Sequence, residues 1–195
     1  MTIGTPRTDV VVSTKDDFSE EEIEHLWEMY DEAFKAKRTE NPCRQYYRHN
    51  DFCDAMKHPD FVRLIGTDRG EVRFFCLLTR QFELIPWIEP AYYECHYPQF
   101  VGHMIYIPVI FVPINLKGAG YFRPLVEAIQ RHMWEYNIWA VLYDHGGAGA
   151  ISLLTEMILR TPNIKSLGTI GTQVYKGVVT FPPGKWPEGL RLKAM

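Results

Sequence analysis

The sequence predicts a single α/β or α+β domain, and three observations support this. The chain has 195 residues, 46% of them hydrophobic, which is enough for one buried core and short for two. Apolar, β-like runs alternate with amphipathic helical patterns. A glycine turn joins an apolar run at 103–114 to a helical pattern at 121–136. We expect one domain over 1–195, with a core at about 10–180 and a loosely packed tail rich in Pro and Gly at 181–195.

Charge and composition argue against several partners. A formal net charge of −3 gives no electrostatic footprint for general nucleic-acid binding. No apolar run approaches the roughly 20 residues that cross a bilayer, and the start, "MTIGTPRTDV", lacks a signal-peptide pattern, so we expect a cytoplasmic protein. The four cysteines form no CxxC pair, which indicates buried free thiols: Cys43, Cys53, Cys76 and Cys95.

The first half of the chain predicts a strand, two helices and a hairpin. The strand is "VVVST" at 10–14, and Ser19, followed by three glutamates, is the expected N-cap of a long amphipathic helix. A second, short helix is expected to be capped at Asn50 or Asp51 and to end before Pro59. "TDRG" at 67–70 predicts a tight turn between two strands.

The second half begins with an irregular piece at 81–103, which carries three prolines and six aromatic residues. We expect an ordered loop or an extra hairpin there. A strand at 103–114, a helix at 121–136 with one apolar stripe, and a strand at 138–145 follow. A "GGAG" turn, a helix at 150–160 and one or two strands at 164–181 complete the order.

This order, together with "VPINLKGAG" at 112–120, resembles the GCN5-related N-acetyltransferase (GNAT) superfamily over roughly residues 10–180. In that family the joint carries an Arg/Gln-x-x-Gly-x-Gly/Ala motif whose backbone amides hold the pyrophosphate of acyl-coenzyme A. The residues at and just after the matching positions are Asn115, Leu116, Lys117, Gly118, Ala119, Gly120 and Tyr121. The resemblance implies a mixed, mostly antiparallel sheet with helices on both faces and a splayed central strand pair.

Elementary physics supports an anion site at this joint. The first turn of a helix leaves N–H groups without intrahelical partners and concentrates positive potential, which a phosphate satisfies. Glycines at 118 and 120 remove Cβ atoms that would keep the anion away, and Lys117 or Arg123 adds charge. Pro124 lies where a missing N–H costs little. The alternative is that a strand-to-helix turn simply favours glycine.

Pro108 is the second indication of an acyl-CoA site, because proline removes a ladder hydrogen bond from a central strand. The resemblance implies that this strand bulges and splays from its neighbour, and that the pantetheine arm of the cofactor pairs with its main chain. The backbone that would line the arm is that of Val109, Ile110, Phe111 and Val112. An edge strand that tolerates proline is the alternative.

The usual proton donor for the departing thiolate is missing. In many family members it is a tyrosine in a pattern like N-x-x-A-I-x-L-Y-E, and "GAGAISLLTE" at 147–156 is the matching stretch. Leu154 stands at the tyrosine position, and Gly147 replaces the asparagine. Tyr143, at the end of a strand, is the nearest candidate replacement, with a packed core tyrosine as the alternative.

Candidate general bases cluster in "YYECHYPQFVGHMIYI" at 92–107. Glu94 and His96 share one strand face if this stretch is extended, and His103 follows soon after. A histidine or a desolvated glutamate beside an apolar cleft titrates near neutrality. Surface histidines are the alternative for the group, and we expect no metal site from it. Asp144 and His145 follow the strand at 138–145 and either face the cleft or cap the next helix.

Two regions are candidates for the acceptor side. The aromatic piece with Trp87 either walls the acceptor pocket, makes a homodimer contact, or packs in the core. "CRQYYRHND" at 43–51 borders the substrate side if the resemblance holds, and there Arg44, Arg48 and His49 suit an anionic or carboxylate-bearing acceptor.

The resemblance implies an acyl-CoA-dependent N-acyltransferase, most simply an acetyltransferase, in which the amine of a small molecule or peptide attacks the thioester directly. Catalysis would rest mainly on positioning the two substrates, so the missing tyrosine does not exclude activity. The alternative is a non-catalytic or repurposed member that binds an acyl thioester or serves as an interaction module. Acyl-homoserine-lactone-like synthesis is a third possibility, with no motif that points to it.

Overall fold

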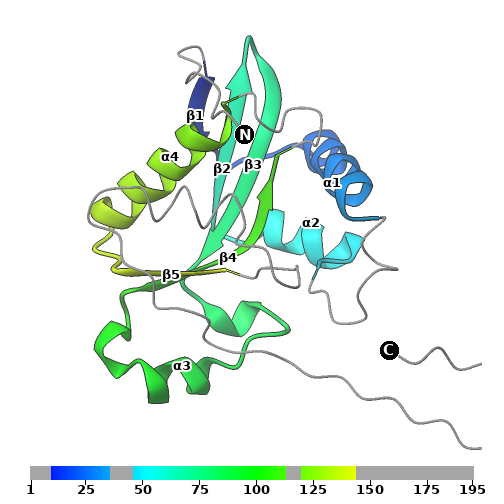
Figure 1. Ribbon diagram of the computed structural model, residues 1–195. Coiled ribbons are helices and arrows are strands. Elements are labelled where there is room, and N and C mark those ends of the chain that lie inside the picture. The colour runs from blue at the N-terminus through cyan, green and yellow to red at the C-terminus, as the bar shows by residue number, and fades with distance from the viewer. Residues whose placement is uncertain (1–9, 36–45, 113–119, 144–195) are drawn as a thin grey trace, which may run out of the picture.

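The computed structural model describes residues 10–35, 46–112 and 120–143. Within these ranges a sheet in the order β1-β2-β3-β4-β5 lies between α1 and α2 on one face and α4 on the other, with α3 beyond one end (Figure 1). The strands are β1 (Val10–Thr14), β2 (Phe61–Asp68), β3 (Glu71–Thr79), β4 (Met104–Phe111) and β5 (Ala140–Tyr143). The helices are α1 (Glu20–Lys35), α2 (His49–Lys57), α3 (Pro90–His96) and α4 (Phe122–Glu135).

The sheet is mixed and mostly antiparallel, as the resemblance implied. The pairs β1–β2, β2–β3 and β3–β4 are antiparallel, and β5 pairs parallel with β4. The predicted strands at 10–14 and within 138–145 and the predicted helix at 121–136 are confirmed to within a few residues. The helix expected at 150–160 and the strands expected at 164–181 lie outside the described residues.

The predicted cap of α1 is confirmed as a reciprocal pair of hydrogen bonds. The backbone N–H of Glu22 donates to Oγ of Ser19 at 3.2 Å, and the N–H of Ser19 donates to Oε2 of Glu22 at 2.9 Å. This capping box satisfies two amides at the helix start. The apolar stripe then buries Ile23, Leu26 and Tyr30 against the sheet.

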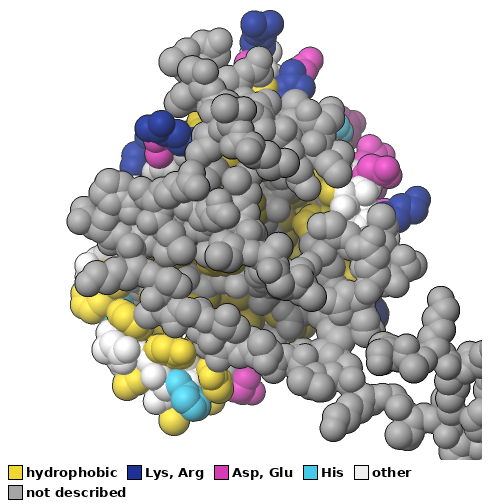
Figure 2. Space-filling model, in the orientation of Figure 1, with side chains coloured by type: hydrophobic (Ala, Val, Ile, Leu, Met, Phe, Trp, Pro, Cys, Tyr) yellow, Lys and Arg dark blue, Asp and Glu magenta, His cyan; other side chains and the backbone are white. Residues whose placement is uncertain are grey.

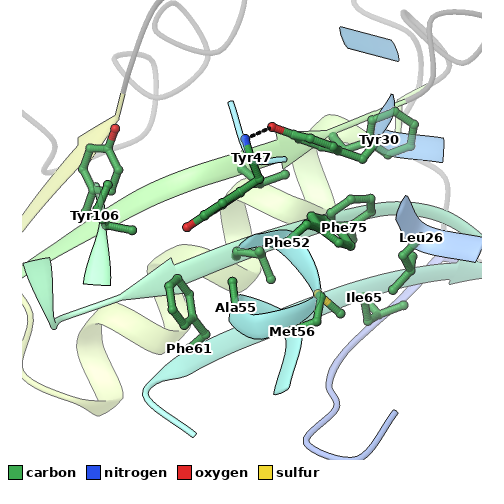
Figure 3. Packing of buried hydrophobic residues seen from close by; sticks show 14 of the residues in the cluster. Leu26, Tyr30, Tyr47, Phe52, Ala55, Met56, Phe61, Ile65, Phe75 and Tyr106 are labelled. Carbon is green, nitrogen blue, oxygen red and sulfur yellow. Dashed lines mark hydrogen bonds between the residues drawn. The ribbon is translucent and has the colours of Figure 1, made fainter. Parts of the chain in front are cut away.

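The prediction that α2 is capped at Asn50 or Asp51 was wrong. The N-cap is Arg48, whose side chain makes no capping hydrogen bond, and Asn50 lies inside the helix. Just upstream, the N–H of Tyr47 donates to Oη of Tyr30 at 2.9 Å (Figure 3). This contact with α1 holds the backbone at the residue before the N-cap, so we infer that tertiary structure, rather than a local side-chain cap, decides where α2 begins.

The hairpin between β2 and β3 has the predicted turn. Arg69 (φ 54°) and Gly70 (φ 82°) both adopt the left-handed conformation that a two-residue hairpin turn requires. Close to the turn, the register shifts by one residue between Gly66 and Thr67. The ring of Phe74 packs so tightly over Gly66 that a Cβ atom there would lie 2.1 Å from it.

The segment at 81–103 is helical, so the extra hairpin was a wrong prediction. It contains α3 and two single 3-10 turns, Phe82–Leu84 and Pro98–Phe100. Glu89 caps α3 by accepting a hydrogen bond from the N–H of Ala91 at 3.2 Å, and Pro90 occupies the first turn. In a helix, residues two apart point about 200° from one another, so Glu94 and His96 do not share a face.

Each face of the sheet carries its own core cluster. On the α1/α2 face the cluster is rich in aromatic residues, among them Tyr30, Tyr47, Phe52, Phe75 and Tyr106 (Figure 3). On the α4 face Leu125, Ala128 and Ile129 pack against Leu64, Phe74, Cys76, Leu78, Ile105 and Ile107. We refer to these as the aromatic cluster and the α4 cluster.

Of the thiols expected to be buried, Cys76 is buried, Cys53 is half-buried, and Cys95 on α3 is exposed, so the expectation was wrong for Cys95.

Hydrophobic side chains are also exposed around α3 and the end of α4 (Figure 2). The large ones are Tyr92, Val101, Trp134, Tyr136 and Trp139. No helix in the described ranges is long and apolar enough to span a membrane.

Candidate functional site

Pro108 lies at a bulge in an interior strand. Leu77 of β3 pairs with Val109, but Thr79 pairs with Tyr106, so β4 contains one extra residue between these pairs. Because β4 lies between β3 and β5, the alternative of an edge strand that tolerates proline does not apply. A bulge bends its strand and breaks the local ladder.

The described residues of β5 pair with β4 up to this bulge. It runs from Met104, opposite Ala140, to Ile107, opposite Tyr143. β4 continues to Phe111 and remains paired with β3 on its other side. The backbone from Val109 to Phe111, which was expected to line the pantetheine arm, therefore extends beyond the described end of β5.

The start of α4 was the other half of the predicted cofactor site. Gly120 has φ 86°, a conformation that glycine adopts at little cost. Tyr121 at the N-cap makes no side-chain capping bond, and its hydroxyl donates instead to Oδ2 of Asp68 at 2.6 Å. Nε of Arg123 donates to Glu127 at 2.8 Å, so its charge is paired along the helix. The rest of the motif, residues 115–119, lies outside the described residues.

From residue 120 onward, where the structure describes the chain, the start of α4 suits an anion. The side chain of Tyr121 at the N-cap makes no capping hydrogen bond within the described ranges, and Pro124, the third helical residue, has no N–H to satisfy. A positive-φ glycine directly before the helix allows close backbone approach. These features fit the pyrophosphate of an acyl-CoA.

An aromatic wall stands on the α1/α2 side of the bulge. Nε1 of Trp87 donates to Oη of Tyr106 at 2.9 Å, and the rings of Trp87 and Tyr47 lie 5.3 Å apart. Tyr106 is two residues before Pro108. Trp87, which was expected either to wall the acceptor pocket, to make a dimer contact or to pack in the core, thus packs against the aromatic cluster while remaining half-buried.

Arg48 and His49 directly follow Tyr47 in the chain, at the start of α2. Both are exposed and line a shallow pocket of about 270 Å³ with Trp27, Tyr46 and Tyr47. Nε2 of His49 donates to Glu24 at 2.8 Å, and this hydrogen bond raises the pKa of His49. Arg44, expected beside them, lies outside the described residues.

Tyr143 is the last described residue of β5 and pairs with Ile107 of β4. Its half-buried ring packs against the α4 cluster, whereas the preceding Leu142 faces the aromatic cluster. The positions of Asp144, His145 and Leu154 lie beyond the described part of the chain.

The three candidate bases, Glu94, His96 and His103, do not form one cluster. On exposed α3, Nδ1 of His96 donates to the carbonyl oxygen of Tyr92 at 2.8 Å, and Glu94 points elsewhere on the helix. His103 lies before β4, at the far end of that strand from Val112. No group of three metal-ligating side chains occurs among the described residues.

His103 contacts the segment that leads into β5 through both its ring and its backbone. Its Nδ1 donates to the carbonyl oxygen of Asn137 at 2.7 Å, and its ring stacks on Trp139 at 3.8 Å. Its carbonyl oxygen accepts from the N–H groups of Trp139 and Ala140. These contacts join the start of β4 to the start of β5.

Tyr47, Tyr106 and Asp68 were not singled out by sequence reasoning. Asp68 was seen only as part of a turn, and the two tyrosines were single members of aromatic-rich segments. Their roles depend on partners 17 to 53 residues away, such as Tyr30 and Tyr121. No local sequence signal marks such partners.

Comparison with known proteins identifies the fold through structure alone. No protein-family model and no curated protein matches the sequence. Among solved structures, AAC(6')-Iy in complex with the bisubstrate analogue CoA-S-monomethyl-acetylneamine is similar, with TM-score 0.52, 11% identity, and coverage of 86% of this chain and 99% of that chain.

Two further structures are similar at the same level. One is an aminoglycoside acetyltransferase from an uncultured soil metagenomic sample, in complex with sisomicin, with TM-score 0.52, 9% identity, and coverage of 86% and 97%. The other is named as a possible acetyltransferase from Clostridium difficile 630, with TM-score 0.54, 10% identity, and coverage of 87% and 99%. The interior bulge, the mixed sheet and these neighbours together show that the chain has the fold of the GCN5-related N-acetyltransferases.

Proposed function

We propose that this protein is an acyl-CoA-dependent N-acyltransferase, most simply an acetyltransferase, that acts on the amine of a small molecule. One observation carries the proposal: the interior strand β4 bulges at Pro108, which interrupts its ladder with β3, and Gly120 with positive φ directly precedes α4. An interrupted strand ladder and helix-start amides are the two features that we propose for an acyl-CoA, one for main-chain hydrogen bonding with its amide-bearing arm and one for its pyrophosphate.

The names of the similar structures support the same proposal. One contains a bisubstrate analogue built on CoA, and another contains the aminoglycoside sisomicin. At 9–11% identity these likenesses give no acceptor for this chain, so the acceptor must be argued from its own residues.

The chain's residues contribute mainly by positioning. The cofactor supplies an acetyl thioester. The nitrogen of the neutral amine forms a bond to the acetyl carbon, the carbon–sulfur bond breaks, the amine loses one proton, and the thiolate gains one. Holding both reactants in line supplies most of the rate gain, and proton transfer adds to it. We propose Tyr143 as the proton donor, because it pairs with Ile107, the residue before the Pro108 bulge.

The test is acetyl-CoA binding, measured by thermal unfolding with two matched glycine variants. Gly120 and Gly70 both have positive φ (86° and 82°), so replacing either with Ala adds similar backbone strain. Acetyl-CoA should raise the Tm of the wild type and of Gly70→Ala by mass action, and raise it much less in Gly120→Ala. Gly118→Glu, which places a carboxylate in the motif, should abolish the shift.

Turnover is followed separately as thiol release from acetyl-CoA over a panel of amines. Release that requires an amine supports the enzyme. No Tm shift at millimolar acetyl-CoA, or equal shifts in the two glycine-to-alanine variants, would contradict the proposed cofactor site. Binding without turnover on any amine would favour a non-catalytic acyl-CoA binder.

A further inference from the structure

Four of the six large hydrophobic side chains that are exposed in the described ranges lie where α4 leads into β5. Trp134 is 67% exposed, Tyr136 51% and Trp139 56%, and all three lie within six residues of the chain. Val101, 48% exposed, lies two residues before His103, whose ring stacks on Trp139. Hydrophobic side chains gather on this part of the surface (Figure 2). We call Val101, Trp134, Tyr136 and Trp139 the α4-end patch.

Two rings of the α4-end patch are held in place by neighbouring side chains. The indole N–H of Trp139 donates to Oδ1 of Asn137 at 2.8 Å, and its ring centre lies 3.8 Å from that of His103. The ring of Tyr136 lies 4.5 Å from that of His132. Rings that already have one orientation lose little side-chain entropy when a partner covers them. The patch is therefore preorganised for contact with another apolar surface.

The α4-end patch is large enough to form the centre of a protein interface. An aromatic side chain buries roughly 150–250 Å² when enclosed, so the three aromatic members, half to two-thirds exposed, present roughly 250–400 Å². A standard interface buries about 800 Å² per partner, with an apolar centre and a polar rim. The patch thus supplies up to about half of one side of such an interface.

Two charges of opposite sign lie beside Trp134 on α4. Arg131 and Glu135 are exposed and four residues apart, on the helix surface next to Trp134. Arg123 and Glu127 have the same spacing and pair with each other at 2.8 Å. Within the part of the chain that the structure describes, neither Arg131 nor Glu135 forms an ion pair. Each is therefore available to a charge of opposite sign on a partner.

A second copy of this chain matches both the apolar patch and the two charges. In a dimer with two-fold symmetry the same surface contacts itself, so a contact from residue i to residue j is repeated from j to i. Two α4 helices that cross antiparallel can place Arg131 opposite Glu135 of the partner subunit, and Glu135 opposite Arg131 of the partner subunit. A partner with charges of one sign would leave Arg131 or Glu135 facing a like charge, which opposes binding.

We propose that the α4-end patch is the centre of a symmetric homodimer interface, with reciprocal Arg131–Glu135 ion pairs beside the two Trp134 side chains. The interface is independent of the proposed acyltransferase function. It lies at the end of α4, whereas the proposed pyrophosphate site lies at its start, and fourteen helical residues separate the two by about 20 Å.

The test is the mass of the full chain in solution, measured by sedimentation velocity from about 1 to 100 µM, because dimers form in a concentration-dependent way. The wild type should sediment as a dimer at the upper end of this range. Trp134→Ser removes an aromatic group from the centre of the interface and should raise the dimer Kd about tenfold or more. Val11→Ser is the matched control, because Val11 is 62% exposed on β1, outside the patch, and its loss should leave the Kd unchanged. Far-UV circular dichroism checks that both variants are folded.

Charge reversal tests whether the partner is a second copy. Arg131→Glu and Glu135→Arg each place like charges opposite one another twice, so each should raise the Kd roughly tenfold. The double variant restores opposite charges and should return to within about threefold of the wild-type Kd. An equimolar mixture of the two single variants should also associate with nearly wild-type affinity, because each supplies the charges that the other lacks. Pairing within one helix predicts no such recovery on mixing.

A wild type that remains monomeric at about 100 µM would overturn the proposal, as it would if another part of the chain covered the patch. A dimer that Trp134→Ser leaves intact, or that Val11→Ser weakens equally, would place the interface elsewhere and overturn it too. Single charge reversals without effect on the Kd, or no recovery in the mixture, would have the same consequence. None of these outcomes bears on acetyl-CoA binding, so the proposed function is tested separately.

Discussion

The hydroxyl of Tyr121 donates a 2.6 Å hydrogen bond to Oδ2 of Asp68, and both residues are at least 95% buried, with 2% and 5% exposure. Tyr121 is the N-cap of α4, and Asp68 ends β2 at the hairpin turn. The ring of Tyr121 also lies 6.4 Å from that of Phe74 on β3. One side chain thus fixes the start of the proposed cofactor-binding helix to the β2–β3 hairpin.

Tyr121→Phe should reduce both stability and cofactor affinity. The change removes a buried hydrogen bond to a carboxyl group, at a cost of about 1–3 kcal/mol, or roughly 2–4 °C of Tm per kcal/mol in a chain of this size. It also loosens the start of α4, so the acetyl-CoA-induced Tm shift should shrink. Asp68→Asn retains an acceptor oxygen and should cost less. Equal stability of Tyr121→Phe and the wild type would contradict the role given to this bond.

Gly66→Ala should destabilise the protein through overpacking. The added Cβ would lie 2.1–2.3 Å from the ring of Phe74, which is fully buried, so the ring or the backbone must shift. Overpacking of this kind costs about 1–3 kcal/mol, measured by denaturant unfolding. Phe74→Leu should partly rescue Gly66→Ala, so that the double variant is more stable than the sum of the single effects predicts. Simple additivity would rule out this contact as the cause.

The features predictable from the sequence are those with local causes. The Ser19–Glu22 cap and the turn at Arg69 and Gly70 each follow from residues within a few positions of each other. Pro108 locally indicated either an edge strand or a bulge, and the resemblance implied the bulge that the structure has. The helix at 90–96 was missed, although Glu89 and Pro90 form a local start signal, because seven residues are too few to show a helical period.

The parts that could not be predicted depend on long-range packing. Asp68 and Tyr121 are 53 residues apart, and Tyr47 and Tyr30 are 17 apart. Neither pair has a spacing or motif that distinguishes it from other polar and aromatic residues. The contacts of His103 were equally unpredictable: its ring joins the start of β4 to the start of β5 through Asn137 and Trp139, 34 and 36 residues away.

The Glu24–His49 bridge between α1 and α2 should give a pH-dependent stability. The hydrogen bond to Glu24, with a smaller contribution from Asn50, raises the pKa of His49 above its ordinary 6.5. Stabilisation is therefore fully present below pH 6.5 and is lost as the pH rises through the raised pKa. The Tm difference between the wild type and His49→Gln should shrink over that range, and Glu24→Gln should behave alike. A gap that widens with pH would contradict the bridge.

Tyr143→Phe separates the two readings of the tyrosine at the end of β5. Its ring packs against the α4 cluster, and phenylalanine keeps that packing, so the Tm should change little if packing is all it provides. As the proton donor to the departing thiolate, its loss should lower kcat about a hundredfold and leave the KM for acetyl-CoA unchanged. The measurement is steady-state thiol release from acetyl-CoA with the best amine. Because the donor would act only as the carbon–sulfur bond breaks, a variant with wild-type kcat would assign Tyr143 to the core, and the thiolate would then leave without a protein acid at this position.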